Sequence, residues 1–166
     1  LVTFTDVPGY LPGVSQETKG IIRHGAKLLY AFSEATVPKI NIILRKAYGG
    51  AYIAMNSKHL GADYVIAWPT AEVAVMGEDG AVEILYAKEL KNLSGKEKTD
   101  FLDKKKAEYK AEVINYKHGL EMGYIDQVIK PSETRETVVA LLNDALRKKK
   151  LRKAKILRKK HGNIPL

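Results

Sequence analysis

Short apolar runs alternate with longer amphipathic stretches along the chain. The most continuous run, residues 40–44, is interrupted only by Asn41, which is typical of a strand buried on both faces of a sheet. Four further short runs predict strands at residues 2–6, 64–67, 73–76 and 125–129. The amphipathic stretches between them predict helices. This alternating order predicts an α/β fold.

The predicted helices have recognisable start and stop signals. In the first, Ser15 is the expected N-cap, apolar residues recur at spacings of three, four and seven, and the helix ends before Pro38. A second helix is expected from Tyr52 to a C-cap at Gly61. Three more are expected at residues 81–90, 97–117 and 134–146, with a glycine turn at residues 77–80 before the first of these three.

The most informative segment is residues 39–55, KINIILRKAYGGAYIAM. Its order predicts a buried strand, a basic pair, a glycine turn at Gly49 and Gly50, and then the start of a helix. Glycines let the backbone come close to a ligand, and the first turn of a helix has N–H groups without intrahelical partners. Such a place binds an anion, or an oxygen that becomes negatively charged during a reaction.

Length and composition favour one globular domain of a cytoplasmic protein. The 166 residues are 45% apolar, which is enough for one well-buried core. The chain has no cysteine, so disulfides and thiolate chemistry are excluded. No apolar run is long enough to span a bilayer. The N-terminus, LVTFTDVPGY, has neither a start methionine nor the order of a signal peptide, so we expect the chain to be part of a longer one.

The net charge of +9 is concentrated at the C-terminal end. Residues 147–160, RKKKLRKAKILRKK, hold ten Lys or Arg and no acid, and the rest of the chain has 18 basic residues against 19 acids. The interleaved apolar residues favour an amphipathic helix in a basic C-terminal segment, residues 147–166. Phosphate or nucleic-acid binding is the alternative, but no aromatic residue is present in the run to stack on a base, so no specific nucleic-acid partner is expected.

Side-chain sets that carry common catalytic chemistry are mostly missing. The histidines are scattered without ligand-like spacing, so no metal site is expected. No G-x-S-x-G motif occurs, which disfavours a serine hydrolase. Glu72 and Glu83 both flank glycine turns and are a candidate acid–base pair, although carboxylates near helix ends are common for electrostatic reasons alone.

Several ordered motifs resemble one known family. They are DVPGYLPG at 6–13, IRHGAK at 22–27, RKAYGGAY at 45–52, AWPTAE at 67–72, GAVEI at 80–84 and HGNIPL at 161–166. Together they resemble the carboxyltransferase (β) subunit of biotin-dependent acyl-CoA carboxylases, with propionyl-CoA carboxylase β subunits as the nearest match. The resemblance extends over the whole chain and is weakest between about residues 87 and 117.

The resemblance implies a fold and a position within a larger protein. Subunits of this family consist of two crotonase-like (ClpP/crotonase) domains, each a ββα superhelix. Residues 1–166 resemble the second, C-terminal domain, on the biotin side, and the superhelix is expected to be incomplete at its N-terminus. The acyl-CoA-binding N-terminal domain of the family has no counterpart in the sequence.

The resemblance also implies an activity and its partners. The family transfers a carboxyl group from N1-carboxybiotin to the α-carbon of a short acyl-CoA, such as propionyl-CoA or acetyl-CoA. Biotin is attached to a biotin carboxyl carrier protein and charged by a biotin carboxylase subunit, and the acyl group arrives as a CoA thioester. Because the two half-sites come from different protomers in the family, a homo-oligomer is expected, and the isolated chain is expected to be inactive.

The family's oxyanion site on the biotin side corresponds to Gly50 and Ala51, where backbone amides would stabilise negative charge on a carbonyl oxygen. The loop at Gly9 and Tyr10 corresponds to the second oxyanion loop of crotonase-like domains. Gly49, Tyr52 and Ile53 are expected to line the substrate pocket beside them. For both glycine segments the alternative is an ordinary tight connection without a ligand.

Ile53 departs from many propionyl-CoA carboxylases, which have Asp at this position. The resemblance implies that the position helps to set acyl-chain preference, so acetyl-CoA or a mixed range stays open, as does simple packing of a helix face. An isoleucine cannot act as an acid or base, which disfavours the hydratases of this superfold. The absence of serine at Ala51 and Tyr52 disfavours its proteases.

Two classes of function therefore stay open. One is an enzyme subunit, either the carboxyltransferase component or a related methylmalonyl-CoA decarboxylase or transcarboxylase subunit, whose direction depends on the other subunits. The other is a noncatalytic assembly or binding module, for which the basic tail and the missing half of the active site are the arguments.

Overall fold

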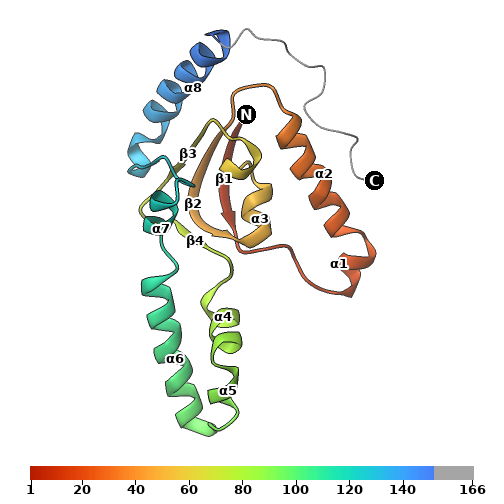
Figure 1. Cartoon of the computed structure of the whole chain (residues 1–166), viewed down its shortest axis with the longest axis vertical. Coiled ribbons are helices and arrows are strands. Elements are labelled where there is room, and N and C mark those ends of the chain that lie inside the picture. The colour runs from red at the N-terminus through yellow and green to blue at the C-terminus, as the bar shows by residue number, and fades with distance from the viewer. Residues whose placement is uncertain (152–166) are drawn as a thin grey trace.

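A parallel β-sheet lies at the centre of the computed structural model, which describes residues 1–151 (Figure 1). The path of the sheet is β1 (Val2–Val7), β2 (Ile40–Tyr48), β3 (Tyr64–Ala67) and β5 (Gln127–Val128), and β4 (Glu72–Ala74) pairs with the end of β2. Every strand pair is parallel, and helical segments connect β1 to β2, β2 to β3 and β4 to β5, whereas β3 leads to β4 through a short turn at residues 68–71. The predicted α/β class is confirmed.

Strand β2 is buried on both faces, as its apolar run predicts. Ile40 and Ile42 point to the face covered by α8 (Thr134–Leu151), whose apolar residues pack against them. Ile43 points to the opposite face, toward Tyr52 of α3 (Gly49–Ala54), and all three isoleucines have no exposed surface. On this second face α2 (Ile21–Glu34) packs against α3. Parallel sheets are stable in this layered arrangement because both faces are removed from water.

The one polar residue in the apolar run has a buried polar partner. Asn41 is fully buried, and its Oδ1 accepts hydrogen bonds from Thr5 Oγ1 at 2.7 Å and from Thr3 Oγ1 at 3.2 Å. Both threonines come from β1, which pairs with β2 in the register Thr3↔Asn41 and Thr5↔Ile43. Asn41 therefore connects the edge strand β1 to the centre of the sheet.

A helical arm, residues 78–112, projects away from the sheet (Figure 1). It consists of α4 (Glu78–Leu85), α5 (Ala87–Leu90) and α6 (Gly95–Glu112). Helix α6 packs against α4 but has no buried residue, whereas Ala81 and Val82 of α4 are buried. After α7 (Tyr116–Glu121) the chain returns to the sheet at β5. No helix among residues 1–151 is long and apolar enough to cross a bilayer.

Several predicted boundaries are wrong for local reasons. The first predicted helix is two helices, α1 (Val14–Thr18) and α2, because Gly20 between them is left-handed with φ +78°. Ser15 lies inside α1, and Gly13 is its N-cap. The helix that was expected to end at Gly61 stops at Ala54, and Gly61 caps the 3₁₀ helix η1 (Lys58–Leu60) instead.

The arm and the last helix also differ from expectation. The helix predicted at 81–90 breaks at Tyr86, which joins α4 to α5, and Gly80 lies inside α4. The helix predicted at 97–117 ends at Glu112, because Asn115 starts α7 by accepting a hydrogen bond from the Lys117 amide. The predicted basic helix at 147–160 is helical as far as residue 151, at the end of α8, and the remainder lies outside the described residues.

A buried lysine holds two helix ends against the sheet. Lys39, immediately before β2, is 3% exposed. Its Nζ donates to the carbonyl of Phe32 in α2 at 2.8 Å and to the carbonyl of Leu60 in η1 at 2.7 Å. Carbonyls in the last turn of a helix have no intrahelical partner, and a cation there also interacts favourably with the helix dipole.

Replacing Lys39 with methionine should therefore destabilise the fold. The variant keeps the length of the apolar stem but leaves the Phe32 and Leu60 carbonyls without this donor, so we expect a loss of about 2 kcal/mol or more in the free energy of unfolding. Urea unfolding of Lys39→Met and of Lys88→Met, an exposed lysine on α5, provides the measurement and its control. Equal stability of the two variants would contradict this role.

Candidate functional site

The segments that leave β1 and β2 start at the same edge of the sheet. The two strands are parallel neighbours, so their carboxyl ends lie side by side. The loop with Gly9 and Tyr10 follows β1, and α3 follows β2. In open α/β sheets ligands bind outside the carboxyl ends of the strands, so the structure brings the two predicted glycine segments to a favourable place.

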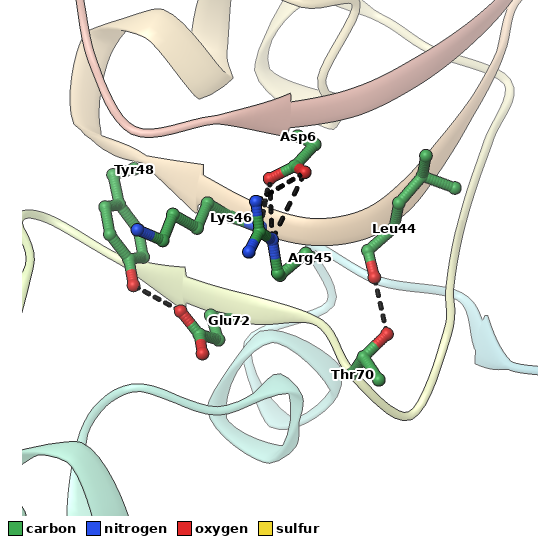
Figure 2. A network of polar contacts seen from close by, with 7 residues as sticks. All are labelled: Asp6, Leu44, Arg45, Lys46, Tyr48, Thr70 and Glu72. Carbon is green, nitrogen blue, oxygen red and sulfur yellow. Dashed lines mark hydrogen bonds and ion pairs between the residues drawn. The ribbon is translucent and has the colours of Figure 1, made fainter.

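Strand β2 changes partners just before it reaches this edge, where the polar contacts of Figure 2 lie. It pairs with β3 up to Ile43↔Ala67 and with β4 from Lys46↔Glu72, and its register with β1 also shifts between Thr5 and Val7. Side chains bond to two backbone groups in this region. Thr70 Oγ1 donates to the Leu44 carbonyl at 2.6 Å.

The register shift between β1 and β2 marks a β-bulge, and Asp6 of β1 binds the β2 backbone there. Its Oδ1 accepts from the Lys46 amide at 3.1 Å, and its Oδ2 pairs with Arg45 Nη2 at 3.1 Å. The Arg45 hydrogen bond keeps the pKa of the Asp6 carboxyl below its usual value. The predicted basic pair is thus part of an extended β2. Bulges of this kind occur next to functional sites because they re-aim the chain.

The expected separate glycine turn is absent, because α3 begins at Gly49 directly after the last strand residue. Gly49 has φ +55°, and a Cβ on it would lie 2.8 Å from the Val75 carbonyl oxygen, so only glycine fits there. Gly50 is different. It is exposed, it lies outside the positive-φ region, and the nearest atom to a Cβ on it would be Tyr10 Cε2 at 4.0 Å.

The amides of Gly50 and Ala51 belong to the first turn of α3, where N–H groups have no partner four residues earlier in the helix. Because no side chain covers the Cα of Gly50, a carbonyl oxygen can approach its amide closely. Ala51 turns its side chain into the protein and is 6% exposed. The pair can therefore offer backbone donors to an oxygen without using an acidic or basic side chain.

Tyr10 lies between α2 and α3. A Cβ on Gly25 of α2 would be 2.5 Å from the Tyr10 hydroxyl and 2.8 Å from its ring, so the ring packs directly on the helix backbone at Gly25. The same ring is the nearest neighbour of the open side of Gly50. Gly25 was not among the predicted site residues, although a glycine within an apolar helix indicates close packing.

The remaining predicted site residues are placed differently. Gly9 is exposed with φ +155° and open space around its Cα. Tyr52 is 4% exposed and belongs to the core cluster with Ile43, so its side chain faces away from solvent. Burial is the main cause that raises the pKa of Tyr52 to about 12. Ile53 is half-buried on α3.

A second set of polar residues adjoins the site at the start of α3. Tyr48, the last residue of β2, donates from its hydroxyl to Glu72 Oε2 at 2.5 Å (Figure 2). Glu72 Oε1 lies 3.5 Å from Lys110 Nζ of α6. Glu72 is thus a hydrogen-bond and ion-pair partner, whereas Glu83 is exposed on α4, and we find no basis for pairing them as acid and base.

The role of Tyr48 was not predicted, because no local pattern links it to a carboxylate 24 residues later in the chain. Its place directly before two glycines was the only available signal. In the part of the chain that the structure describes, no group of three or more His, Asp or Glu side chains is arranged to hold a metal ion.

Comparisons with known proteins identify the family. A family model described as the carboxyl transferase domain matches residues 1–164. The methylmalonyl-CoA decarboxylase subunit alpha of Propionigenium modestum is 53% identical over 166 residues, which are 100% of this chain and 31% of that protein. A putative propionyl-CoA carboxylase beta chain of Bacillus subtilis is 52% identical over the whole chain and 32% of its own length.

A solved structure agrees with these relatives. The transcarboxylase 12S subunit, described as a hexamer assembly with methylmalonyl-coenzyme A and methylmalonic acid bound, has a TM-score of 0.83 at 47% identity, over 99% of this chain and 31% of that one. The chain therefore spans about a third of the length of these relatives. Since the family model matches nearly every residue and the relatives match along the full length, the chain belongs to the carboxyl transferase domain family.

Proposed function

We propose that this chain is the biotin-side domain of an acyl-CoA carboxyltransferase, with residues 1–166 forming the C-terminal crotonase-like domain of a longer protein. The reaction moves a carboxyl group from N1 of carboxybiotin to the α-carbon of a short-chain acyl-CoA, and the proton that leaves the α-carbon is accepted at N1 of biotin. The observation that supports it is the open backbone at Gly50, in the first turn of α3 and beside Tyr10. The family membership makes this chemistry the expected one.

The residues of the site fit the needs of the biotin side. Carboxybiotin held here would supply the carboxyl group, and its ureido oxygen would need donors for the negative charge left when that group departs. The amides of Gly50 and Ala51 stabilise such charge by donating hydrogen bonds, and they need no proton transfer to do so. Tyr10 covers one side of this position, and the amides of the Gly9 loop are further donors that we assign to the same oxygen or to its neighbour.

In our proposal the acyl-CoA half of the reaction takes place on another domain. Carboxyl transfer also forms an enolate from the thioester, whose oxygen needs its own donors, and we assign these to an acyl-CoA-binding domain of a second protomer. A homo-oligomer, a biotin carboxyl carrier protein and a biotin carboxylase are the implied partners. The hexamer described for the transcarboxylase 12S subunit supports the oligomer.

Carboxyl transfer in the opposite direction, from a carboxylated acyl-CoA to biotin, has equal support. Relatives named methylmalonyl-CoA decarboxylase and propionyl-CoA carboxylase are 53% and 52% identical to the chain, so identity does not separate them. In a decarboxylase or transcarboxylase the carboxyl group leaves the acyl-CoA and is accepted by biotin, and the same amides stabilise the same oxygen. A noncatalytic module is the remaining alternative, and loss of activity on disturbing Gly50 would argue against it.

Replacing Gly50 with valine in the full-length protein should keep a carbonyl oxygen from approaching the amide closely. Carboxyl transfer should then fall by at least ~10²-fold, the effect expected for one lost oxyanion donor. The fold should survive, because a Cβ at Gly50 has no neighbour closer than 4.0 Å and φ is not positive. Steady-state turnover and circular dichroism together provide the measurement. Gly80→Val, at an exposed helical glycine of α4, is the matched control and should keep its turnover. A folded Gly50→Val protein with normal turnover would refute the assignment.

Ile53→Asp should change the preference among acyl-CoA substrates. If Ile53 borders the acyl end of the pocket, the ratio of kcat/KM for acetyl-, propionyl- and butyryl-CoA should shift by an amount worth about 1–3 kcal/mol. Ile53→Val keeps an apolar side chain and is the control, for which a smaller shift is expected. An equal loss for all three substrates would mean that Ile53 only packs the helix.

A further inference from the structure

Tyr48 is enclosed by the segment that leads from β4 into the helical arm. It is 4% exposed, and its backbone pairs with Ala74 of β4. A Cβ on Gly77 would lie 3.4 Å from the Tyr48 ring, so that glycine packs against the ring. The next residue, Gly49, abuts the Val75 carbonyl oxygen. Residues 74–77 therefore fix the backbone position from which α3 starts.

Glu72 fixes the other end of the tyrosine. Its carboxylate accepts from the Tyr48 hydroxyl at 2.5 Å, and Glu72 is itself only 20% exposed in its side chain. Burial, and then the hydrogen bond to Glu72, raise the pKa of Tyr48, so the phenol stays protonated and remains a donor. With both its ring and its hydroxyl held, Tyr48 has little freedom to move.

Lys110 connects this pair to the helical arm. Its Nζ lies 3.5 Å from Glu72 Oε1 and 3.9 Å from Glu78 Oε1, so it joins α6 to β4 and to the first turn of α4. A second ion pair within the arm, Lys106 with Asp79 at 2.6 Å, joins the same two helices. Of these two lysines, Lys110 is the one that reaches the carboxylate that holds Tyr48.

We propose that Tyr48 and Glu72 are positioning residues for the amides of Gly50 and Ala51, and that Lys110 makes their position depend on the docking of the helical arm. The inference rests on the proposed function, because it assigns those amides to the reacting oxygen. Donors of this type work only when they are held at the productive position, and a displacement of about 1 Å can lower turnover by about 10²-fold. Gly49 cannot absorb such a displacement, since the Val75 carbonyl blocks one side of it.

The test uses the full-length protein and transfer of the carboxyl group from methylmalonyl-CoA, the donor, to free biotin, the acceptor. Tyr48→Phe keeps the ring and removes the donor, whereas Glu72→Gln keeps an acceptor and removes the charge that pairs with Lys110. We expect each to lower kcat by about tenfold or more, with KM for acyl-CoA within about twofold of the unmodified protein. The double variant with Tyr48→Phe and Glu72→Gln should lower kcat little more than Tyr48→Phe alone does, because the two residues act as one unit.

Asp79→Asn is the matched control for arm stability. It breaks the other α4–α6 ion pair without touching Tyr48, so kcat should stay within about twofold of the unmodified protein. Urea unfolding of all variants separates positioning from stability, since a purely structural role predicts a loss of activity that follows the loss of folded protein. Such a parallel loss, or an Asp79→Asn effect equal to that of Glu72→Gln, would overturn the proposal.

Gly50→Val in the same assay distinguishes a failure of the proposed function from a failure of the positioning role. If Gly50→Val is impaired while Tyr48→Phe and Glu72→Gln retain normal kcat, the positioning role is refuted and the proposed function stands. If Gly50→Val itself has normal turnover, the proposed function fails, and the positioning role fails with it. Loss in Gly50→Val, Tyr48→Phe and Glu72→Gln, with Asp79→Asn unaffected, supports both.

Discussion

The division of β2 between two partners is the constraint on which the candidate site depends. Its first half is a fully buried central strand, paired with β1 and β3, and its last residues pair with β4. Where it changes partners, the backbone must be satisfied without a regular ladder. Asp6 accepts from the Lys46 amide and Thr70 donates to the Leu44 carbonyl, so the bulge is held from both sides and α3 starts beside β4 and not beside β3.

Three glycines near this point have different physical reasons. Gly25 leaves room for the Tyr10 ring, and Gly49 adopts a left-handed conformation against the Val75 carbonyl. At Gly50 a Cβ would clash with no neighbour and φ is not positive, so the fold itself does not require a glycine there. An unrequired glycine in the first turn of a helix, at the carboxyl edge of a parallel sheet, is better explained by the approach of a ligand than by folding. Gly50 is therefore the central residue of the proposed reaction.

The sequence predicted well what depends on local pattern. The uninterrupted apolar run of β2 correctly indicated burial on both faces, and the ordered motifs indicated the family. It could not predict that Arg45 and Lys46 belong to the strand, because both bind Asp6, which comes from another strand. Asp6 lies 39 residues before Arg45 in the chain. For the same reason the Tyr48–Glu72–Lys110 connection and the contact of Tyr10 with Gly25 became visible only in three dimensions. The break at Gly20 was readable from the sequence, since glycine is the residue that most readily adopts positive φ.

A crystal structure of the full-length protein with biotin bound would show whether biotin binds at the amides of Gly50 and Ala51. We expect the ureido oxygen of biotin at about 2.7–3.1 Å from the amide nitrogen of Gly50 or Ala51, the separation of an oxyanion donor from its acceptor. Tyr10 should lie beside the bound ring system. Biotin held at another surface, with the thioester of acyl-CoA against Gly50 in its place, would contradict the assignment of this domain to the biotin side.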